Sequence, residues 1–138
     1  MFSITTEAIN SDDLRKKLEN SQAGAFVCFE GWVRNHNEGK GVLRLEYESY
    51  ENLANSEGKK IIEEAKAKFD IHDALAVHRT GKLEISEMAV WVGVISSHRK
   101  ESFQACEFII DEIKARVPIW KKEFYNDGND EWIAQHNE

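Results

Sequence analysis

Proline and cysteine are scarce in this chain, and acidic residues outnumber basic ones. Its 138 residues include one proline, two cysteines, 18 Lys and Arg and 25 Asp and Glu, for a net charge of −7. This charge argues against a broad nucleic-acid or acidic-membrane surface, because both require a basic face. The sequence also lacks an apolar run near the ~20 residues of a membrane span and a signal-peptide pattern at its start. We therefore expect a cytoplasmic protein without nucleic-acid or membrane partners.

Motifs of several common chemistries are missing as well. The five histidines form no HExxH pattern and no pair four residues apart, so we expect no metal site. Neither a phosphate-binding P-loop nor a serine-nucleophile motif is present. Cys28 and Cys106 are far apart and belong to no CxxC pair, which is typical of reduced, buried thiols.

The apolar pattern predicts one α+β domain over residues 1–138, long enough for a proper core. We expect three helices, starting near Ser11, Asn52 and Ser97, with Asn10 or Ser11 capping the first. Expected strands cover residues 2–8, 25–33, 43–48, 74–78, 82–85 and 89–96, with a further one after the last helix. This mixed order favours a sandwich of helices on a mixed or antiparallel sheet. Residues 126–138 are acidic and polar, so we expect a mobile tail.

Several side chains are predicted to be buried from their spacing. Leu43, Leu45 and Tyr47 alternate with charged residues and should share one face of a strand. Phe103 begins a helical stripe that continues through Cys106, Ile109 or Ile110, Ile113 and Val117. Trp32, Trp91 and Trp120 fall in predicted strands, where core packing is the default.

The single proline lies in a cationic stretch, Lys114 to Glu123. Pro118 cannot donate a backbone hydrogen bond and restricts the residue before it, so the last helix should end near Val117. Lys114 would then lie on the final turn and Lys121 on an extended segment beyond. Two ammonium groups could thereby face one pocket for an anionic ligand. The spacing fits equally a Lys114 that only complements the negative helix end.

Two further segments also fit either ligand binding or a purely structural role. Ser97-His98-Arg99-Lys100 stands where a strand gives way to the last helix, so it could bind an anion or simply cap that helix. Val33-Arg34-Asn35-His36-Asn37 ends a strand, which suits a ligand-binding side chain such as Arg34 but also an exposed polar turn.

Five ordered segments together resemble the large, catalytic subunits of molybdopterin synthase. They are Phe29 to Asn37, Leu45 to Tyr50, His78 to Leu83, Ser96 to Arg99 and Ile113 to Glu123. The resemblance spans residues 2 to about 132. It departs from the family at Ser86, where relatives often have glycine.

This resemblance implies an α/β hammerhead fold and a sulfurtransferase activity. Such enzymes convert cyclic pyranopterin monophosphate to molybdopterin by inserting two dithiolene sulfurs. The sulfur arrives on the C-terminal Gly-Gly thiocarboxylate of a small ubiquitin-like subunit. Two large subunits form a central homodimer, with a small subunit at each end of a heterotetramer. The resemblance implies neither cofactor nor metal for the large subunit.

The resemblance also implies roles for individual residues. Arg34 belongs to the substrate pocket, with Trp32 and Val33 beside it, and the pair His98 and Arg99 binds substrate. Lys114 matches the lysine nearest the thiocarboxylate, and Lys121 matches a second essential lysine flanked by Lys122 and Glu123. Two alternatives stay open: an adaptor that binds the small subunit without chemistry, and a phosphate-binding module of another pathway.

Overall fold

The computed structural model describes residues 1–134, which form two sheets. The first sheet contains β1 (Phe2–Thr5), β2 (Ala25–Trp32), β5 (Asp73–Arg79) and β7 (Met88–Ser96), in the order β1-β5-β7-β2. β1 runs parallel to β5, and the other two pairings are antiparallel. The sheet is therefore mixed, as predicted.

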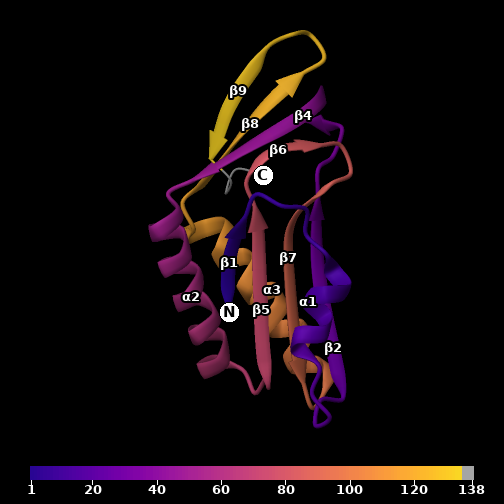
Figure 1. Ribbon diagram of the computed structural model, residues 1–138, viewed down its shortest axis with the longest axis vertical. Coiled ribbons are helices and arrows are strands. Elements are labelled where there is room, and N and C mark those ends of the chain that lie inside the picture. Colours follow the sequence, from indigo (N-terminus) through magenta and orange to yellow (C-terminus); the bar gives the residue numbers. More distant parts are fainter. Residues whose placement is uncertain (135–138) are drawn as a thin grey trace.

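The second sheet stands at one end of the first (Figure 1). It contains β3 (His36–Asn37), β4 (Lys40–Ser49), β8 (Ile119–Tyr125) and β9 (Asp130–Ala134) in that order, and β6 (Gly81–Glu84) also pairs with β4. All its pairings are antiparallel. β4 is the longest of these strands and carries three of the others as neighbours.

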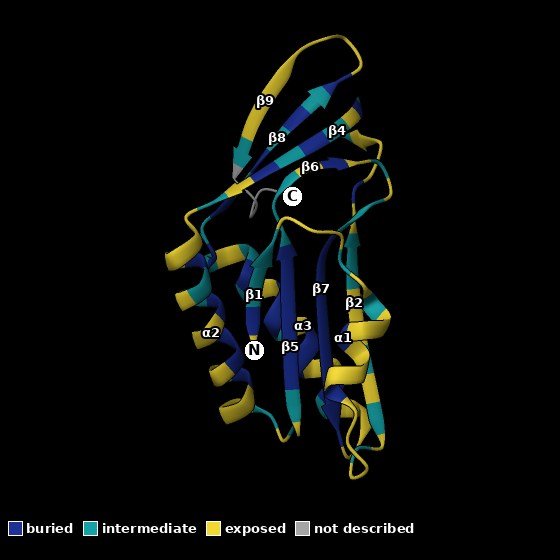
Figure 2. Cartoon of the chain, in the orientation of Figure 1, coloured by how far each residue is buried: buried dark blue, intermediate teal, exposed yellow. Residues whose placement is uncertain are grey.

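Helices cover both faces of the first sheet. α1 (Ser11–Leu18) packs its two leucines against one face, on Leu75, Val77, Trp91 and Ile95. α2 (Glu51–Lys68) and α3 (Arg99–Arg116) pack on the opposite face, in the larger apolar core. Figure 2 shows β5 and β7 buried for most of their length, as a central position between helix layers requires. The α+β prediction is confirmed.

Local sequence signals explain the helix positions. Asn10 caps α1, because its side-chain oxygen accepts a hydrogen bond from the Asp13 backbone N–H at 3.1 Å. On α2, a Cβ at Gly58 would lie 2.1 Å from the Phe2 ring, so glycine permits the close approach of this helix to β1. Among residues 1–134, none of the helices combines the length and apolar composition of a membrane span.

Two side chains predicted to be buried are exposed. Leu43 is 49% exposed, because the β4–β8 pairing shifts register between Val42 and Arg44 and brings Val42 into the core instead. Phe103 is 60% exposed, since the buried stripe of α3 starts from Ser102 and continues through Ala105 and Cys106.

Two other expectations about burial are wrong, and the predicted tail contains an unexpected strand. Trp32 is exposed at the end of an edge strand, whereas Trp91 is fully buried. Cys28 is an exposed free thiol, and only Cys106 is buried. The predicted tail contains a strand that the sequence did not indicate, β9, which pairs with β8 along its whole length. Residues 135–138 lie outside the described part of the chain.

Ser86, in the turn between β6 and β7, has a backbone conformation that glycine favours. Its φ is +73°, and its N–H donates to the Val33 carbonyl at 2.7 Å. Ser86→Gly should therefore raise the free energy of unfolding by about 1 kcal/mol, because relief of left-handed strain exceeds the added chain entropy. Urea denaturation measures this. Ser21→Gly, in an exposed turn where φ is not positive, should lower stability instead, and equal effects at both positions would contradict the strain argument.

Candidate active site

A cavity of about 280 Å³ lies where the end of β2, the second sheet and the last turn of α3 meet. Residues from both ends of the cationic Lys114–Glu123 stretch line it, and so does Arg34. Its lining consists of Phe29, Glu30, Gly31, Trp32, Arg34, Leu45, Tyr47, Lys114, Lys121 and Glu123. The cavity thus gathers three cations and two carboxylates in a chain with a net negative charge.

The chain reversal at Pro118 brings Lys114 and Lys121 together. α3 ends at Arg116, and the N–H of Val117 donates to the Ile113 carbonyl at 3.1 Å as the last helical bond. β8 starts at Ile119 and pairs antiparallel with β4. Alternate side chains of β8 are buried, so Lys121 and Glu123 point inward beside Tyr47 and Leu45 of β4. The predicted break near Val117 is confirmed.

Two of the three charged residues of β8 are almost completely buried. Lys121 is 4% exposed and Glu123 is 1% exposed, and the Lys121 Nζ lies 3.9 Å from the Glu123 Oε1. Asn37 donates from Nδ2 to the same Oε1 at 2.6 Å, and its Oδ1 accepts from the Arg34 Nη2 at 2.9 Å. A polar chain therefore joins Arg34, Asn37, Glu123 and Lys121. Burial of charge is costly without such partners.

Trp32 and Val33 have different positions. The Trp32 indole is 65% exposed at the cavity and donates to the Glu30 carboxylate at 3.0 Å. Val33 is buried in the core and does not line the cavity. Its N–H donates to the Glu87 carbonyl at 3.0 Å, which fixes the chain just before Arg34.

Two cations of the Lys114–Glu123 stretch point away from the cavity. Lys122 lies on the opposite face of β8 from Lys121, 3.8 Å from the Asp130 carboxylate and over the Trp132 ring. Arg116 bonds to carboxylates on both α2 and α3, including Glu64 at 2.7 Å. Lys122 is therefore not brought to this cavity within one chain.

His98 and Arg99 are also remote from the cavity within one chain. They stand at the first turn of α3, whereas Lys114 is on its last turn, about 22 Å away along the helix axis. They line a separate surface hollow of about 560 Å³ with Lys100 and Phe103. The hydroxyl of Ser96 donates to the His98 carbonyl and so fixes the backbone there.

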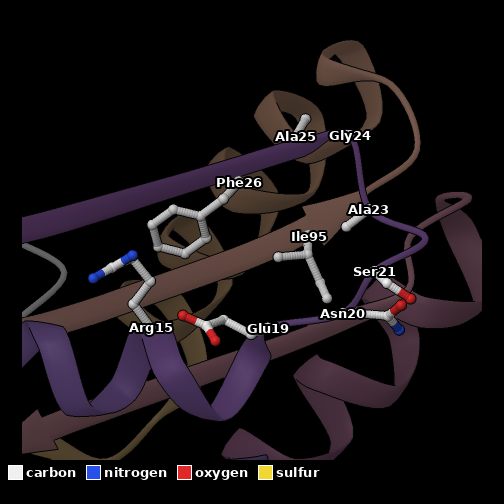
Figure 3. Close-up of a pocket in the computed structure, with 9 residues that line it drawn as sticks. All are labelled: Arg15, Glu19, Asn20, Ser21, Ala23, Gly24, Ala25, Phe26 and Ile95. Carbon is white, nitrogen blue, oxygen red and sulfur yellow. The ribbon is translucent and has the colours of Figure 1, made fainter.

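A second hollow of about 510 Å³ lies between α1 and the start of β2 (Figure 3). Its floor is apolar, with Phe26 and Ile95, and Arg15 and Glu19 stand at its side. It does not gather cations as the first cavity does. Among the described residues, no group of three His, Cys, Asp or Glu side chains is placed to hold a metal ion.

Neither cysteine is suited to act as a nucleophile near neutral pH. Burial raises the pKa of the Cys106 thiol to about 11, and burial together with Glu30 raises the pKa of Cys28. The thiolate is the reactive form, so both groups stay mostly protonated at neutral pH. Neither thiol belongs to the residues that line the cavity.

Comparison with known proteins agrees with the resemblance read from the sequence. The MoaE protein family matches residues 4–116. The chain belongs to the MoaE family. A molybdopterin synthase catalytic subunit from Thermoplasma volcanium is 44% identical over 129 residues, 94% of each chain.

Comparison with solved structures shows that this MoaE-family chain also shares their fold. The crystal structure of molybdopterin synthase from Staphylococcus aureus has a TM-score of 0.91 and 39% identity, and the match covers 96% of both chains. One chain from Helicobacter pylori, in a complex of subunits 1 and 2 of molybdopterin-converting factor, has a TM-score of 0.76. Its sequence identity is 23%, so the match shows a shared fold alone. The match covers 96% of this chain and 88% of the Helicobacter pylori chain.

Sequence reasoning missed several residues of the cavity. Asn37 does not line the cavity but contacts two residues that do; the sequence showed it only as part of a polar turn, and its bond to Glu123 joins positions 86 residues apart. Tyr47 was predicted to face inward, but nothing in its spacing indicated a neighbouring lysine. Glu30 and Phe29 belong to an edge strand whose register alone gives no sign of a cavity.

Glu123→Gln tests whether the buried carboxylate stabilises this MoaE chain. The amide retains an acceptor for Asn37 but removes the negative charge beside Lys121, so the free energy of unfolding should fall by about 1–3 kcal/mol at pH 7. Urea denaturation measures the loss. Glu46→Gln removes a partly exposed charge from the other face of β4 and should change stability by less than about 0.5 kcal/mol. Equal, small effects would show that Glu123 contributes only as a polar side chain.

Proposed function

We propose that this protein is the catalytic subunit of a molybdopterin synthase. It would convert cyclic pyranopterin monophosphate to molybdopterin with sulfur from the C-terminal thiocarboxylate of a small ubiquitin-like subunit. The observation that carries this proposal is the cavity, in which Arg34, Lys114 and Lys121 line one space in a protein of the MoaE family. Its relatives are named catalytic subunits, which implies that a partner subunit exists. A simple phosphate-binding module would need no such partner.

The chemistry of the cavity suits two anionic reactants. The cyclic phosphate and the thiocarboxylate both carry negative charge, which Arg34, Lys114 and Lys121 would attract. Because the cavity is partly closed to water, these cations would interact strongly with charge that develops as sulfur attacks. Lys114, on the last helical turn, would position the thiocarboxylate. Lys121, held near Glu123, would supply a proton as the cyclic phosphate opens.

The partner's tail would enter as an extended peptide. Capture of a C-terminal segment is a common mode of peptide recognition, and a carboxylate-like end is recognised mainly by charge. The exposed Trp32 at the cavity offers an apolar surface for such a tail. The raised pKa values of Cys28 and Cys106 fit a mechanism in which this subunit contributes no sulfur of its own.

Lys114→Ala and Lys121→Ala should each lower the rate of product formation at least ~100-fold, because each removes a charge that acts on the reacting groups. The assay mixes the protein with thiocarboxylated small subunit and cyclic pyranopterin monophosphate and quantifies dithiolene product after oxidation to its fluorescent form. Lys122→Ala is the matched control, since its side chain faces the other side of the same strand, and should retain activity within about threefold. Near-normal turnover in both cavity variants would exclude the mechanism.

The same assay separates the alternatives. An adaptor would bind the small subunit stably but give no product even as wild-type protein. A phosphate-binding module of another pathway would form neither product nor complex. Product that requires both the small subunit and the pterin substrate would exclude both.

The remote position of His98 and Arg99 supports a composite site in a homodimer. β2 is an edge strand of the first sheet, with Phe26 and Phe29 exposed on it. Its first residue, Ala25, pairs with Ser96 near His98, and its last, Trp32, lies at the cavity. Antiparallel pairing of two β2 strands about a two-fold axis would bring the His98 end of one copy to the cavity of the other. We propose that substrate is gripped by Arg34 of one copy and His98 and Arg99 of the second.

Mixed dimers test the composite site. Arg99→Ala and Lys121→Ala should each be nearly inactive alone. After denaturation and refolding together in equal amounts, half of the dimers carry one variant of each kind, and each of these has one intact site. Activity should therefore return to about one quarter of wild type. If mass spectrometry shows that heterodimers form but activity does not recover, the composite site is excluded. Either all these residues then belong to the site of one chain, or Arg99 does not belong to the site.

A further inference from the structure

Asn37 joins two charged side chains of the cavity that are distant in sequence. It lies on the two-residue strand β3, which pairs with the start of β4. Its amide accepts a hydrogen bond from Arg34 at 2.9 Å and donates one to Glu123 at 2.6 Å. The Glu123 oxygen that receives this bond is also the one 3.9 Å from the Lys121 ammonium. A single neutral side chain therefore connects the loop after β2 with the two buried charged residues of β8, Lys121 and Glu123.

The two neighbours determine how the amide is oriented. A guanidinium group can only donate, and an ionised carboxylate can only accept, so the oxygen must face Arg34 and the nitrogen must face Glu123. The amide also separates the two charges. Direct contact would favour a two-bond pairing of Arg34 with the carboxylate, whereas the bond to Asn37 takes one of the five guanidinium N–H groups. Arg34 is thereby oriented without its charge being neutralised by an adjacent acid.

We propose that Asn37 is a positioning residue of this cavity. Its amide holds Arg34 and Glu123 in place, and through Glu123 it holds the Lys121 ammonium in the arrangement that receives the anionic substrate. The inference rests on the proposed function, because it assigns a role in that reaction. Asn37 itself need not touch the substrate. Lys121 is proposed to act on the reaction step, so loss of the bond from Asn37 to Glu123 should lower the rate after binding more than it weakens binding.

Other ionisable groups share this part of the fold and must be considered when pH is varied. Burial and nearby carboxylates, Glu123 among them, raise the pKa of Tyr125 to about 12, so it stays neutral below pH 9. Lys114 on α3, Glu30 on β2 and Tyr47 on β4 line the same cavity. His36 adjoins Asn37 in sequence and contacts Asn35. The charged and titratable groups near Asn37 or its partners therefore include Arg34, Glu123, Lys121, Lys114, Glu30, Tyr47 and Tyr125. Lys40 also lies opposite Asn37 in the β3–β4 pairing, and His36 is adjacent in sequence.

Asn37→Asp replaces the amide with a group of the same shape whose hydrogen-bonding capacity depends on pH. Ionised aspartate could still accept from Arg34, but it would repel Glu123 and could not donate to it. A protonated aspartic acid has one carbonyl acceptor and one O–H donor, so it reproduces both bonds of the asparagine. Two carboxyl groups in such close contact favour uptake of one proton, as in other carboxylate pairs. Lower pH should therefore restore the wild-type arrangement.

The experiment compares Asn37→Asp with wild type between pH 5.5 and 8.5, in the complete assay with thiocarboxylated small subunit and pterin substrate. At pH 8.5 the variant's kcat should be about 10- to 100-fold lower, with KM changed by less than about threefold. At pH 5.5 the ratio of the two kcat values should return to within about threefold. Using the ratio at each pH cancels effects of pH on the small subunit and on the wild-type residues.

Thermal unfolding gives a second readout that does not depend on activity. If the acid pair takes up a proton on folding, the folded variant binds more protons than its unfolded chain, in which aspartate has a pKa near ~3.9. Its stability must then fall as pH rises through the higher folded value. The deficit in Tm relative to wild type should accordingly be small at pH 5.5 and large at pH 8.5.

Asn35→Asp is the matched control. It makes the same substitution two residues earlier, at an exposed side chain outside the cavity lining, and should give ratios near one that do not vary with pH. The proposal is overturned if Asn37→Asp matches wild type at pH 8.5, if its deficit is independent of pH, or if Asn35→Asp shows the same loss. If wild type itself forms no product, the proposed function fails, and the Tm comparison alone decides whether Asn37 forms the link.

Discussion

The structure depends on one sharp change of direction, between α3 and β8. Pro118 has no N–H to continue the helix, and Val117 before it takes an extended conformation, with φ −77° and ψ 126°. The chain then pairs with β4 from Ile119 onward, and this pairing builds the second sheet on the end of the first. A helix one turn longer would carry Lys121 past β4 and leave no cavity. Pro118 thus lies at the turn that starts the β8 pairing and brings Lys114 and Lys121 to one cavity.

Charged side chains are arranged differently at the protein surface and in the cavity. Elsewhere cations are paired at the surface, as Arg116 is with carboxylates of α2 and α3, where each pair contributes modestly to stability. In the cavity, Lys121 and Glu123 are buried, and the long separation of their charged atoms gives little of the energy that a close pair would provide. An apolar pair would pack there at lower cost. The proposed anionic substrate would use the charge of Lys121, and the link through Asn37 shows how the Glu123 carboxylate is accommodated without neutralising Arg34.

Much of the fold followed from local pattern, and the errors share a physical cause. The continuous apolar run of β7 and the cap at Asn10 depend on neighbours in sequence, so both were predictable. Leu43 was misplaced because a register shift opposite β8 interrupts the alternation of β4, and bulges depend on the partner strand. Phe103 was misplaced because two adjacent stripes of α3 are similarly apolar and only contact with the sheet selects one. β9 contains the short apolar run Trp132 to Ala134 after two acidic residues, and the polar, acidic residues around this run hid a strand that only its pairing with β8 reveals.

By itself, the sequence determined the α+β class, the end of the last helix and the ordered motifs of the MoaE family, because each is written in residues close together along the chain. It also placed Arg34, Lys114, Lys121 and Glu123 among the candidates. Only the tertiary structure decided which of these share a cavity. Strand alternation turns Lys121 and Glu123 inward and Lys122 outward, while the length of α3 carries His98 and Arg99 to the opposite end of the sheet. Proximity across the fold depends on register and helix length together, and no short stretch of sequence contains both.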